Sequence, residues 1–503
     1  MSEPAAPAKR KAHARMDLTK GPIARTLLLF SLPVLGSSAL QSINGSINAI
    51  WVGRLLGEEA LAATTNANLI LFFLLGAVFG VGMAGTILVG HAVGAKDLPR
   101  AKIVVGTTAT FFLGISLAMA VGGYAASEQV LALMGTPESA RPLAEAYLRV
   151  IFLSMPFLYF FTFLVMVQRG AGDAHTPFRF MALSAFLDVC FNPMLITGFG
   201  PFPRMGIAGA AASTLLSQAI GMAAMLAYLY WRKADLRLKR DELHYLKPDR
   251  GVLRTIVFKG LPMGAQMLVI SLSGIIMMAM INAYGAETTA AYGVAMQIWT
   301  YVQMPAMAIG AAVSSMSAQN VGAKKWDRLE RSAYIGASIN VLMTGALVLL
   351  VRFVDPFIVD LFLPGRPQAV ASALHINNLA GWSFVFFGVT FTLFGVVRST
   401  GAVTPPLVIL FISLFGMRVG FAKLLEPAWG QDAIWWAFPV SMGFSALLAL
   451  GYYRLGGWRK TRMGAPAREV EDAPVTGAGV PAIDAEVANE EAPELDQEPA
   501  QAT

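Results

Sequence analysis

Long apolar stretches follow one another along almost the whole chain, separated by short polar segments. A helix that spans the hydrocarbon core of a bilayer needs roughly 20 mostly apolar residues. The pattern therefore predicts an all-α polytopic membrane protein with about a dozen membrane helices. The predicted spans are 25–52, 62–90, 103–123, 146–167, 178–199, 206–231, 256–284, 290–317, 331–354, 374–397, 404–424 and 432–453.

Composition supports this prediction and argues against an enzyme. Of the 503 residues, 56% are hydrophobic and 14% are charged, whereas a soluble domain typically has about 25% charged residues. The single cysteine, Cys190, cannot form an internal disulfide, and the five histidines show no metal-ligand spacing. The sequence also has no GxxxxGK[ST] loop for ATP. We therefore expect no cofactor, no metal centre and no catalytic activity.

The distribution of charge predicts the orientation in the membrane. Lysine and arginine concentrate in the first 20 residues, in the loop at 95–102, in the segment 232–259 and after the last span. These segments share one side if the helices alternate, and the opposite loops carry acids such as Glu287, Asp355 and Glu426. By the positive-inside rule, both termini of this multi-pass cell-membrane protein are expected to be cytoplasmic. The first apolar run is too long for a cleaved signal peptide.

The two halves of the chain resemble each other. Four segments of the first half recur in order in the second half at a nearly constant offset of 228 or 229 residues. The pairs are SLPVLG (31–36) with GLPMGA (260–265), GEEALAA (57–63) with GAETTAA (285–291), HAVGAKDLPRA (91–101) with QNVGAKKWDRL (319–329), and RGAGDAHTP (169–177) with RSTGAVTP (398–405). This repeat predicts two six-helix lobes of the same orientation around a central cavity, a design that suits alternating access.

The repeat and the charge pattern together predict the domain organisation. From residue 464 onward the chain has ten acidic residues and one basic residue with few large apolar ones, which predicts a disordered tail. The expected parts are a basic cytoplasmic leader at 1–24, the first lobe at 25–231, a cytoplasmic linker at 232–255, the second lobe at 256–455 and the acidic cytoplasmic tail at 456–503.

Several of these segments resemble the multidrug and toxic compound extrusion (MATE) transporters. The resemblance runs from about Arg25 to Leu455 and rests on motifs in a fixed order. They are SLPVLGSSALQSINGSINAIWVGRLLGEEALAA, the VGAKD and VGAKK loops, LMGTPESARPLAEAYLRV, RGAGDAHTP and FNPMLITGFGPFPRMGIAGAAAST. The resemblance implies twelve helices in two lobes and export of small organic compounds in exchange for inward H+ or Na+.

One carboxylate falls well inside a predicted span. Asp188 lies in the fifth span, with Ser184 and Asn192 four residues away on either side, so the three share a helix face. The first span offers a matching polar face made of Gln41, Asn44 and Asn48. An ionisable group in a bilayer is costly and therefore a functional hypothesis by default. We expect these six residues to form a proton or cation coupling site, or else a structural hydrogen-bonded cluster.

The site departs from the family's pattern. MATE proteins typically have Asp where this chain has Asn48, and Asn-x-x-x-Asp where it has Asp188 and Asn192. A lone protonatable Asp favours H+ over Na+, which prefers several oxygen ligands. No acid occurs in 260–283 or 374–397, so coupling is assigned to the first lobe.

Two further features bear on mechanism. Pro33 removes a backbone hydrogen bond near the start of the first span. Similar proteins bend this helix during transport, although an ordinary helix-start proline is an equal alternative. Arg418 is the main intramembrane cation. The alternative functions are a flippase for lipid-linked precursors and a non-transporting receptor or scaffold. A flippase for a phosphorylated lipid should have several cationic residues within its cavity. We expect a monomer in the lipid bilayer with no nucleic-acid partner.

Overall fold

The computed structural model describes residues 16–133, 138 and 141–463. Most of the predicted leader and of the predicted acidic tail lie outside the described residues. Within the described part every regular element is a helix, so the predicted all-α class is confirmed.

Helices of the first half account for the first six predicted spans. They are α1 (Ile23–Leu56), α2 (Glu58–Gly94), α3 (Leu98–Ala125), the short α4 (Ser127–Leu133), α5 (Arg141–Gly170), α6 (His175–Thr197) and α7 (Ile207–Trp231). The short helix η1 (Arg240–Leu246) follows, in the segment between the two halves.

Helices of the second half account for the remaining six spans. They are α8 (Arg250–Asn282), α9 (Ala286–Gly322), α10 (Trp326–Phe362), α11 (Pro367–Ala380), α12 (Ser383–Ser399), α13 (Thr404–Phe411), the π-helix η2 (Ile412–Val419), α14 (Gly420–Trp429) and α15 (Gln431–Leu455). The short η3 (Gly457–Lys460) follows α15.

Length and apolar character identify most of these helices as membrane spans. Among the described residues nine helices are long and apolar enough, and the pair α11 and α12, bent by 40° at its break, makes a tenth. The other two predicted spans coincide with α2 and α9, each a single helix of 37 residues. Helix α9 is less apolar because many polar side chains, including Gln319 and Asn320, lie on it.

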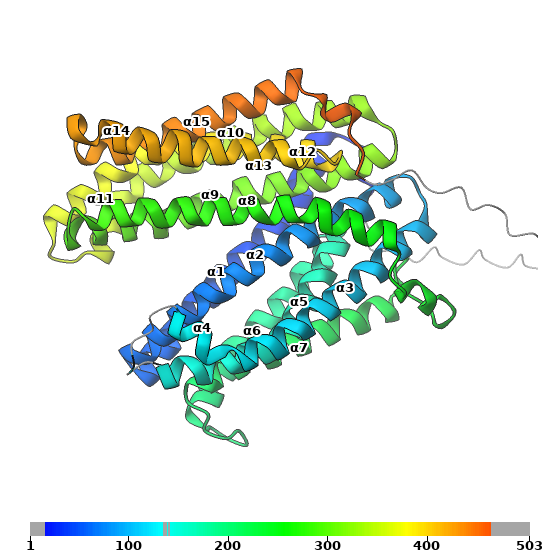
Figure 1. The fold of residues 1–503 in the computed structure, drawn as a ribbon, viewed down its shortest axis with the longest axis horizontal. Coiled ribbons are helices and arrows are strands. Elements are labelled where there is room, and N and C mark those ends of the chain that lie inside the picture. The colour runs from blue at the N-terminus through cyan, green and yellow to red at the C-terminus, as the bar shows by residue number, and fades with distance from the viewer. Residues whose placement is uncertain (1–15, 134–137, 139–140, 464–503) are drawn as a thin grey trace, which may run out of the picture. The chain divides into compact units, whose positions relative to one another are not determined.

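Most helices of each half pack on one another. Helices α3, α5, α6 and α7 form one bundle, and α10, α12 and α15 lie together in the other (Figure 1). The bundles meet where α2 contacts α8 and α9, and where α1 contacts α9. At mid-length of α2, a Cβ added to Gly80 would lie 2.2 Å from the backbone nitrogen of Gly264. Only glycine permits this approach, so small residues set the packing of α2 on α8.

The ends of α2 and α9 cross with the symmetry that the repeat implies. A Cβ at Gly94 would lie 1.9 Å from the carbonyl oxygen of Gln319, and one at Gly322 would lie 2.0 Å from that of His91. Gly94 and Gly322 are equivalent at the offset of 228, and so are His91 and Gln319. The contact is therefore reciprocal.

The side chains at this crossing are reciprocal too. Nε2 of Gln319 donates to the carbonyl of Gly170 at 2.9 Å, and Nε2 of His91 lies 2.7 Å from the carbonyl of Ser399. Gly170 and Ser399 are themselves equivalent in the repeat. Each half thus reaches into the end of a helix in the other half.

Residues 16–21, called the N-terminal strap, lie across the same end. The Met16 nitrogen donates to the carbonyl of Gly172 at 3.0 Å, and the Leu18 nitrogen donates to Oε1 of Gln319 at 3.3 Å. Arg328 of α10 donates to the carbonyls of Leu18, Lys20 and Gly21. The strap therefore joins the α5–α6 loop to α9 and α10.

Asp355 lies within a helix and not in the outer loop that the sequence predicts. Helix α10 continues through it to Phe362. Its side chain is buried against α11. The Asp355-Pro356 pair interrupts the apolar stretch, but Phe357, Ile358 and Val359 resume it and the helix continues through the pair.

Candidate functional site

The first-half site begins with the close approach of α1 and α6. A Cβ at Gly36 would lie 2.6 Å from the Phe178 ring, so glycine lets the two helices come together one turn into their contact. Both helices then carry polar residues at a spacing of four, Asn44 and Asn48 on α1 and Asp188 and Asn192 on α6. Equal spacing on two packed helices stacks the polar pairs as successive rungs.

The first rung holds the buried carboxylate. Nδ2 of Asn44 donates to Oδ2 of Asp188 at 2.7 Å. On the other side, the Ser213 hydroxyl of α7 donates to Oδ1 at 2.5 Å, and the Thr214 hydroxyl lies near the carboxylate. The Asp188 side chain is only 4% exposed. No Lys, Arg or His of the described residues forms an ion pair with it, so hydrogen bonds alone compensate its burial.

The second rung is uncharged. Nδ2 of Asn192 donates to Oδ1 of Asn48 at 2.5 Å. The buried phenol of Tyr147 on α5 also bonds Asn48. This rung holds Asn48 in place and closes the site on the side of α5.

Two predicted site residues lie apart from these rungs. Gln41 is exposed on α1, and no contact between it and Asp188 is present in the described structure. Ser184 is buried one turn before Asp188, where its Cβ faces Gly221 of α7. The structure thus brings together Asn44, Asn48, Asp188 and Asn192, while Ser184 borders them and Gln41 does not reach them.

Three contributors were missed from the sequence. Ser213, Thr214 and Tyr147 all touch the rungs, yet small hydroxyl residues and tyrosines are common in membrane helices. A Ser-Thr pair within the apolar stretch 206–231 was the available signal. Nothing in the sequence says that α7 faces Asp188.

The site can hold a proton more readily than a metal ion. Among described residues no group of three or more His, Cys, Asp or Glu side chains could hold a metal ion. Oδ1 of Asn44 and Oδ1 of Asn192 are buried and have no hydrogen-bond partner in the described part of the chain. A small cation could use these oxygens beside the carboxylate, but it would find one negative charge only.

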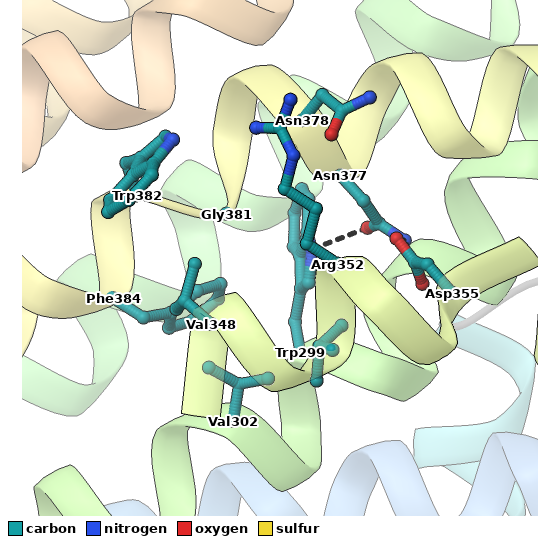
Figure 2. A pocket seen from close by; sticks show the side chains of 11 residues that line it. Trp299, Val302, Val348, Arg352, Asp355, Asn377, Asn378, Gly381, Trp382 and Phe384 are labelled. Carbon is teal, nitrogen blue, oxygen red and sulfur yellow. Dashed lines mark hydrogen bonds between the residues drawn. The ribbon is translucent and has the colours of Figure 1, made fainter. Parts of the chain in front are cut away.

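A second buried carboxylate lies in the other half. Nδ2 of Asn377 on α11 donates to both oxygens of Asp355, at 3.0 and 2.9 Å, and Oδ1 of Asn377 accepts from Nε1 of Trp299 at 2.8 Å. Arg352 and Trp382 also line the pocket at this group, a cavity of about 20 Å³, and Figure 2 shows Trp382 on the side away from Asp355. Such a cavity admits about one water molecule. These hydrogen bonds tie α9, α10 and α11 together. The cavity beside them is too small for an organic ligand.

The fold and the intramembrane site define a multi-pass membrane protein, and comparisons identify its family. The sequence model of the MatE family matches residues 33–194 and 262–424, one match in each half. The chain belongs to this family and is a MATE-family transporter. The predicted fold class and family are thereby confirmed.

Relatives match nearly the whole described chain. The "Probable multidrug resistance protein YoeA" of Bacillus subtilis is 34% identical over 447 residues, covering 88% of this chain and 96% of the relative. "YpnP" of the same organism, also named a probable multidrug resistance protein, is 32% identical, covering 89% and 98%. A solved "MATE in the bent conformation" superposes with a TM-score of 0.80 at 21% identity, covering 88% and 98%.

Proposed function

We propose that the protein is a secondary active exporter of small organic compounds, driven by inward H+ through alternating access. The observation that carries this proposal is the Asp188 carboxylate, which is buried among membrane helices without a counter-ion among the described residues. Burial favours the neutral form of such a group, while the hydrogen bonds from Asn44 and Ser213 support the charged form, so both forms are accessible. Two relatives are named as probable multidrug resistance proteins, which supports organic compounds as cargo.

The proton and the cargo would compete through the first-half site. When Asp188 is ionised it accepts from Asn44 and Ser213, and when one of its oxygens is protonated, that oxygen becomes a donor and its partner must reorient. This change would alter how α1 packs on α6 and α7. Alternation between outward and inward states would then depend on the protonation state, with both termini cytoplasmic and the protomer working alone.

A Na+-coupled variant of this function is the second candidate. It is favoured by the unpaired Oδ1 atoms of Asn44 and Asn192, which are the ligand type that Na+ uses. It is disfavoured by the single carboxylate of the site.

The proposed exporter has the domain limits that the sequence predicts, with a linker at 232–255 between its two lobes.

Efflux from proteoliposomes separates these candidates. Purified protein is reconstituted and loaded with a fluorescent cationic compound such as ethidium, under an imposed pH gradient or an imposed Na+ gradient. We expect efflux with the pH gradient, no response to Na+, and loss of gradient-driven efflux in Asp188→Asn. Undiminished efflux from Asp188→Asn would refute the assignment of the site, and efflux with Na+ alone would select the second candidate.

A further inference from the structure

Arg418 is a buried cation without a counter-ion. It lies on the π-helix η2 between α13 and α14, and its side chain is 8% exposed. No carboxylate of the described residues lies within ion-pair distance of it. A charged residue inside a membrane bundle is costly, and π-helical segments frequently occur at functional sites.

The guanidinium is anchored on one side and unpaired on the other. Nε donates to the Ser441 hydroxyl of α15 at 3.0 Å, and the ring centroid of Phe438 lies 4.7 Å from the guanidinium carbon. The two Nη atoms have no partner among the described residues, and they are not sealed from outside. Four N–H groups therefore remain free for an acceptor.

Arg398, the other buried arginine of this half, differs in this respect. Its Nε donates to the carbonyl of Phe394 at 3.1 Å and its Nη1 to Oε1 of Gln266 at 3.2 Å, while its remaining Nη2 is fully enclosed. Arg398 is thus a structural residue, and Arg418 is the cation that a ligand can still reach.

Three hydroxyl groups without partners among the described residues lie on η2, on α15 and on α8, which packs on both. Ser413 precedes Arg418 by five residues, about one turn of a π-helix, and Ser445 follows Ser441 by one turn of α15. Both hydroxyls, and that of Ser273 on α8, are fully buried and lack a hydrogen-bond partner among described residues. Helices α8, η2 and α15 pack on one another. This part of the second half therefore holds donors in excess and no acid.

Arg418 lies near the level of Asp188 in the other half, but on a different face of its helix. The Thr-Pro pair at 176–177 recurs at 404–405, so Arg418 corresponds to position 190, two residues beyond Asp188. The repeat therefore places a carboxylate in one lobe and a guanidinium at nearly the same level of the other. Tyr292, Trp435 and Phe438 are packed against each other beside Arg418.

We propose that Arg418 binds the oxyanion group of an organic cargo, such as a carboxylate, so that the exporter accepts anionic or zwitterionic compounds. The planar guanidinium matches a carboxylate with two parallel N–H donors. This inference rests on the proposed export function and names its cargo class.

Charge-selective efflux tests the proposal. Proteoliposomes free of anionic lipid are loaded with 5-carboxyfluorescein or with ethidium, and efflux is followed under a pH gradient. Arg418→Gln is expected to reduce 5-carboxyfluorescein efflux about tenfold or more while ethidium efflux stays within about twofold. Arg418→Lys keeps the charge without the fork and should fall in between. Lys423→Gln, at an exposed position of α14, is the matched control and should behave as wild type.

A binding measurement keeps the test independent of transport. Fluorescence anisotropy of 5-carboxyfluorescein with the purified protein should show binding that benzoate displaces and that Arg418→Gln loses. The proposal would be overturned if Arg418→Gln lost efflux of 5-carboxyfluorescein and of ethidium to the same extent. It would also be overturned if this variant bound 5-carboxyfluorescein as wild type does. Displacement of the probe by phosphatidylglycerol but not by benzoate would overturn it too, and would assign Arg418 to a lipid headgroup.

The two proposals fail in different ways. Asp188→Asn should stop gradient-driven efflux of both probes yet leave 5-carboxyfluorescein binding at Arg418 unchanged. If Asp188→Asn transports normally while Arg418→Gln loses only the anionic probe, the coupling assignment fails and the cargo assignment stands.

Discussion

A few hydrogen bonds decide how the buried Asp188 behaves. Its carboxylate accepts from an amide of α1 and a hydroxyl of α7, so three helices meet at one acid. A hydrogen bond to a charged group contributes about 1.5–3 kcal/mol, and a buried charge that loses such a donor has no water to replace it. The partners of Asp188 should therefore matter nearly as much as the acid itself.

Ser213→Ala tests this dependence. Removing the hydroxyl leaves Oδ1 of Asp188 without its nearest donor, and we expect gradient-driven ethidium efflux to fall about tenfold in proteoliposomes. Ser217→Ala is the control one turn along α7, because Ser217 bonds only the carbonyl of Thr214. Equal activity of the two variants would show that Ser213 does not support the site.

Residue identity was easier to predict than residue contact. Asp188, Asn44, Asn48 and Asn192 could be found because polar groups at helical spacing stand out in apolar spans. Gln41 was grouped with Asn44 and Asn48, but its side chain is exposed although the α1–α6 contact extends to either side of it. Ser213 could not be distinguished from other small hydroxyl residues, since its role depends on which helix α7 packs against.

At the scale of helices, length and apolar character predicted the elements well but not their ends. The break between α11 and α12 falls inside the predicted span 374–397, at Gly381 and Trp382. The π-helix η2 falls inside 404–424 and could not be seen, because one extra residue per turn leaves no mark in hydropathy. Asp355 was misplaced for a different reason: a charged residue followed by proline looks like the end of a helix, but α10 continues through both.

Helix α1 runs without interruption past Pro33, from Ile23 to Leu56. A proline in a helix lacks one backbone hydrogen bond, which makes bending there easier. If bending is part of transport, Pro33→Ala should reduce ethidium efflux several-fold without lowering the melting temperature. Pro262→Ala, at the equivalent position of α8, should have a smaller effect. Wild-type efflux from Pro33→Ala would leave Pro33 as an ordinary helix residue.

An ion pair and a hydrogen bond join the helix η1 to α3, and the ion pair should make this contact depend on pH. Nζ of Lys102 lies 2.5 Å from Oε1 of Glu242, and this hydrogen bond holds the pKa of Glu242 below its usual range. Because the folded-state pKa is lowered, the ion pair stabilises the contact fully at pH values above the unfolded-state pKa of Glu242. This stabilisation is lost as the pH falls through the folded-state pKa.

Hydrogen exchange of residues 240–246 measures this contact. Protection should be present at neutral pH and should decrease on acidification below the ordinary range of a glutamate pKa. Glu242→Gln should lack this pH dependence, and Asp241→Asn, its exposed neighbour, should keep it. A wild-type profile that is flat with pH would contradict the account.

At the scale of the whole described bundle, the internal repeat is visible as contacts. His91 and Gln319 were matched in sequence, and each reaches the end of a helix in the other half. The N-terminal strap adds a contact on one side only, through Leu18 and Arg328. The charge pattern predicts that this end of the bundle is cytoplasmic, and under the proposed function it would come apart for cargo to enter from that side.

Weakening the strap should open this end more often. In a Cys190→Ser background, a cysteine replacing the fully buried Leu18 should react slowly with a membrane-impermeant maleimide. Adding Arg328→Ala removes three hydrogen bonds to backbone carbonyls, and we expect labelling about tenfold faster. Arg331→Ala, exposed on the same helix, is the control. Equal labelling of all three proteins would show that the strap does not close this end.

The central claim is that the exchanged proton resides on Asp188, and proton release on cargo binding measures it most directly. Ethidium is added to the purified protein in weakly buffered detergent solution, and the pH is followed with a soluble indicator. The account predicts that wild type releases about one proton per bound ethidium near neutral pH, while Asp188→Asn binds ethidium and releases none. Equal proton release from Asp188→Asn would contradict it.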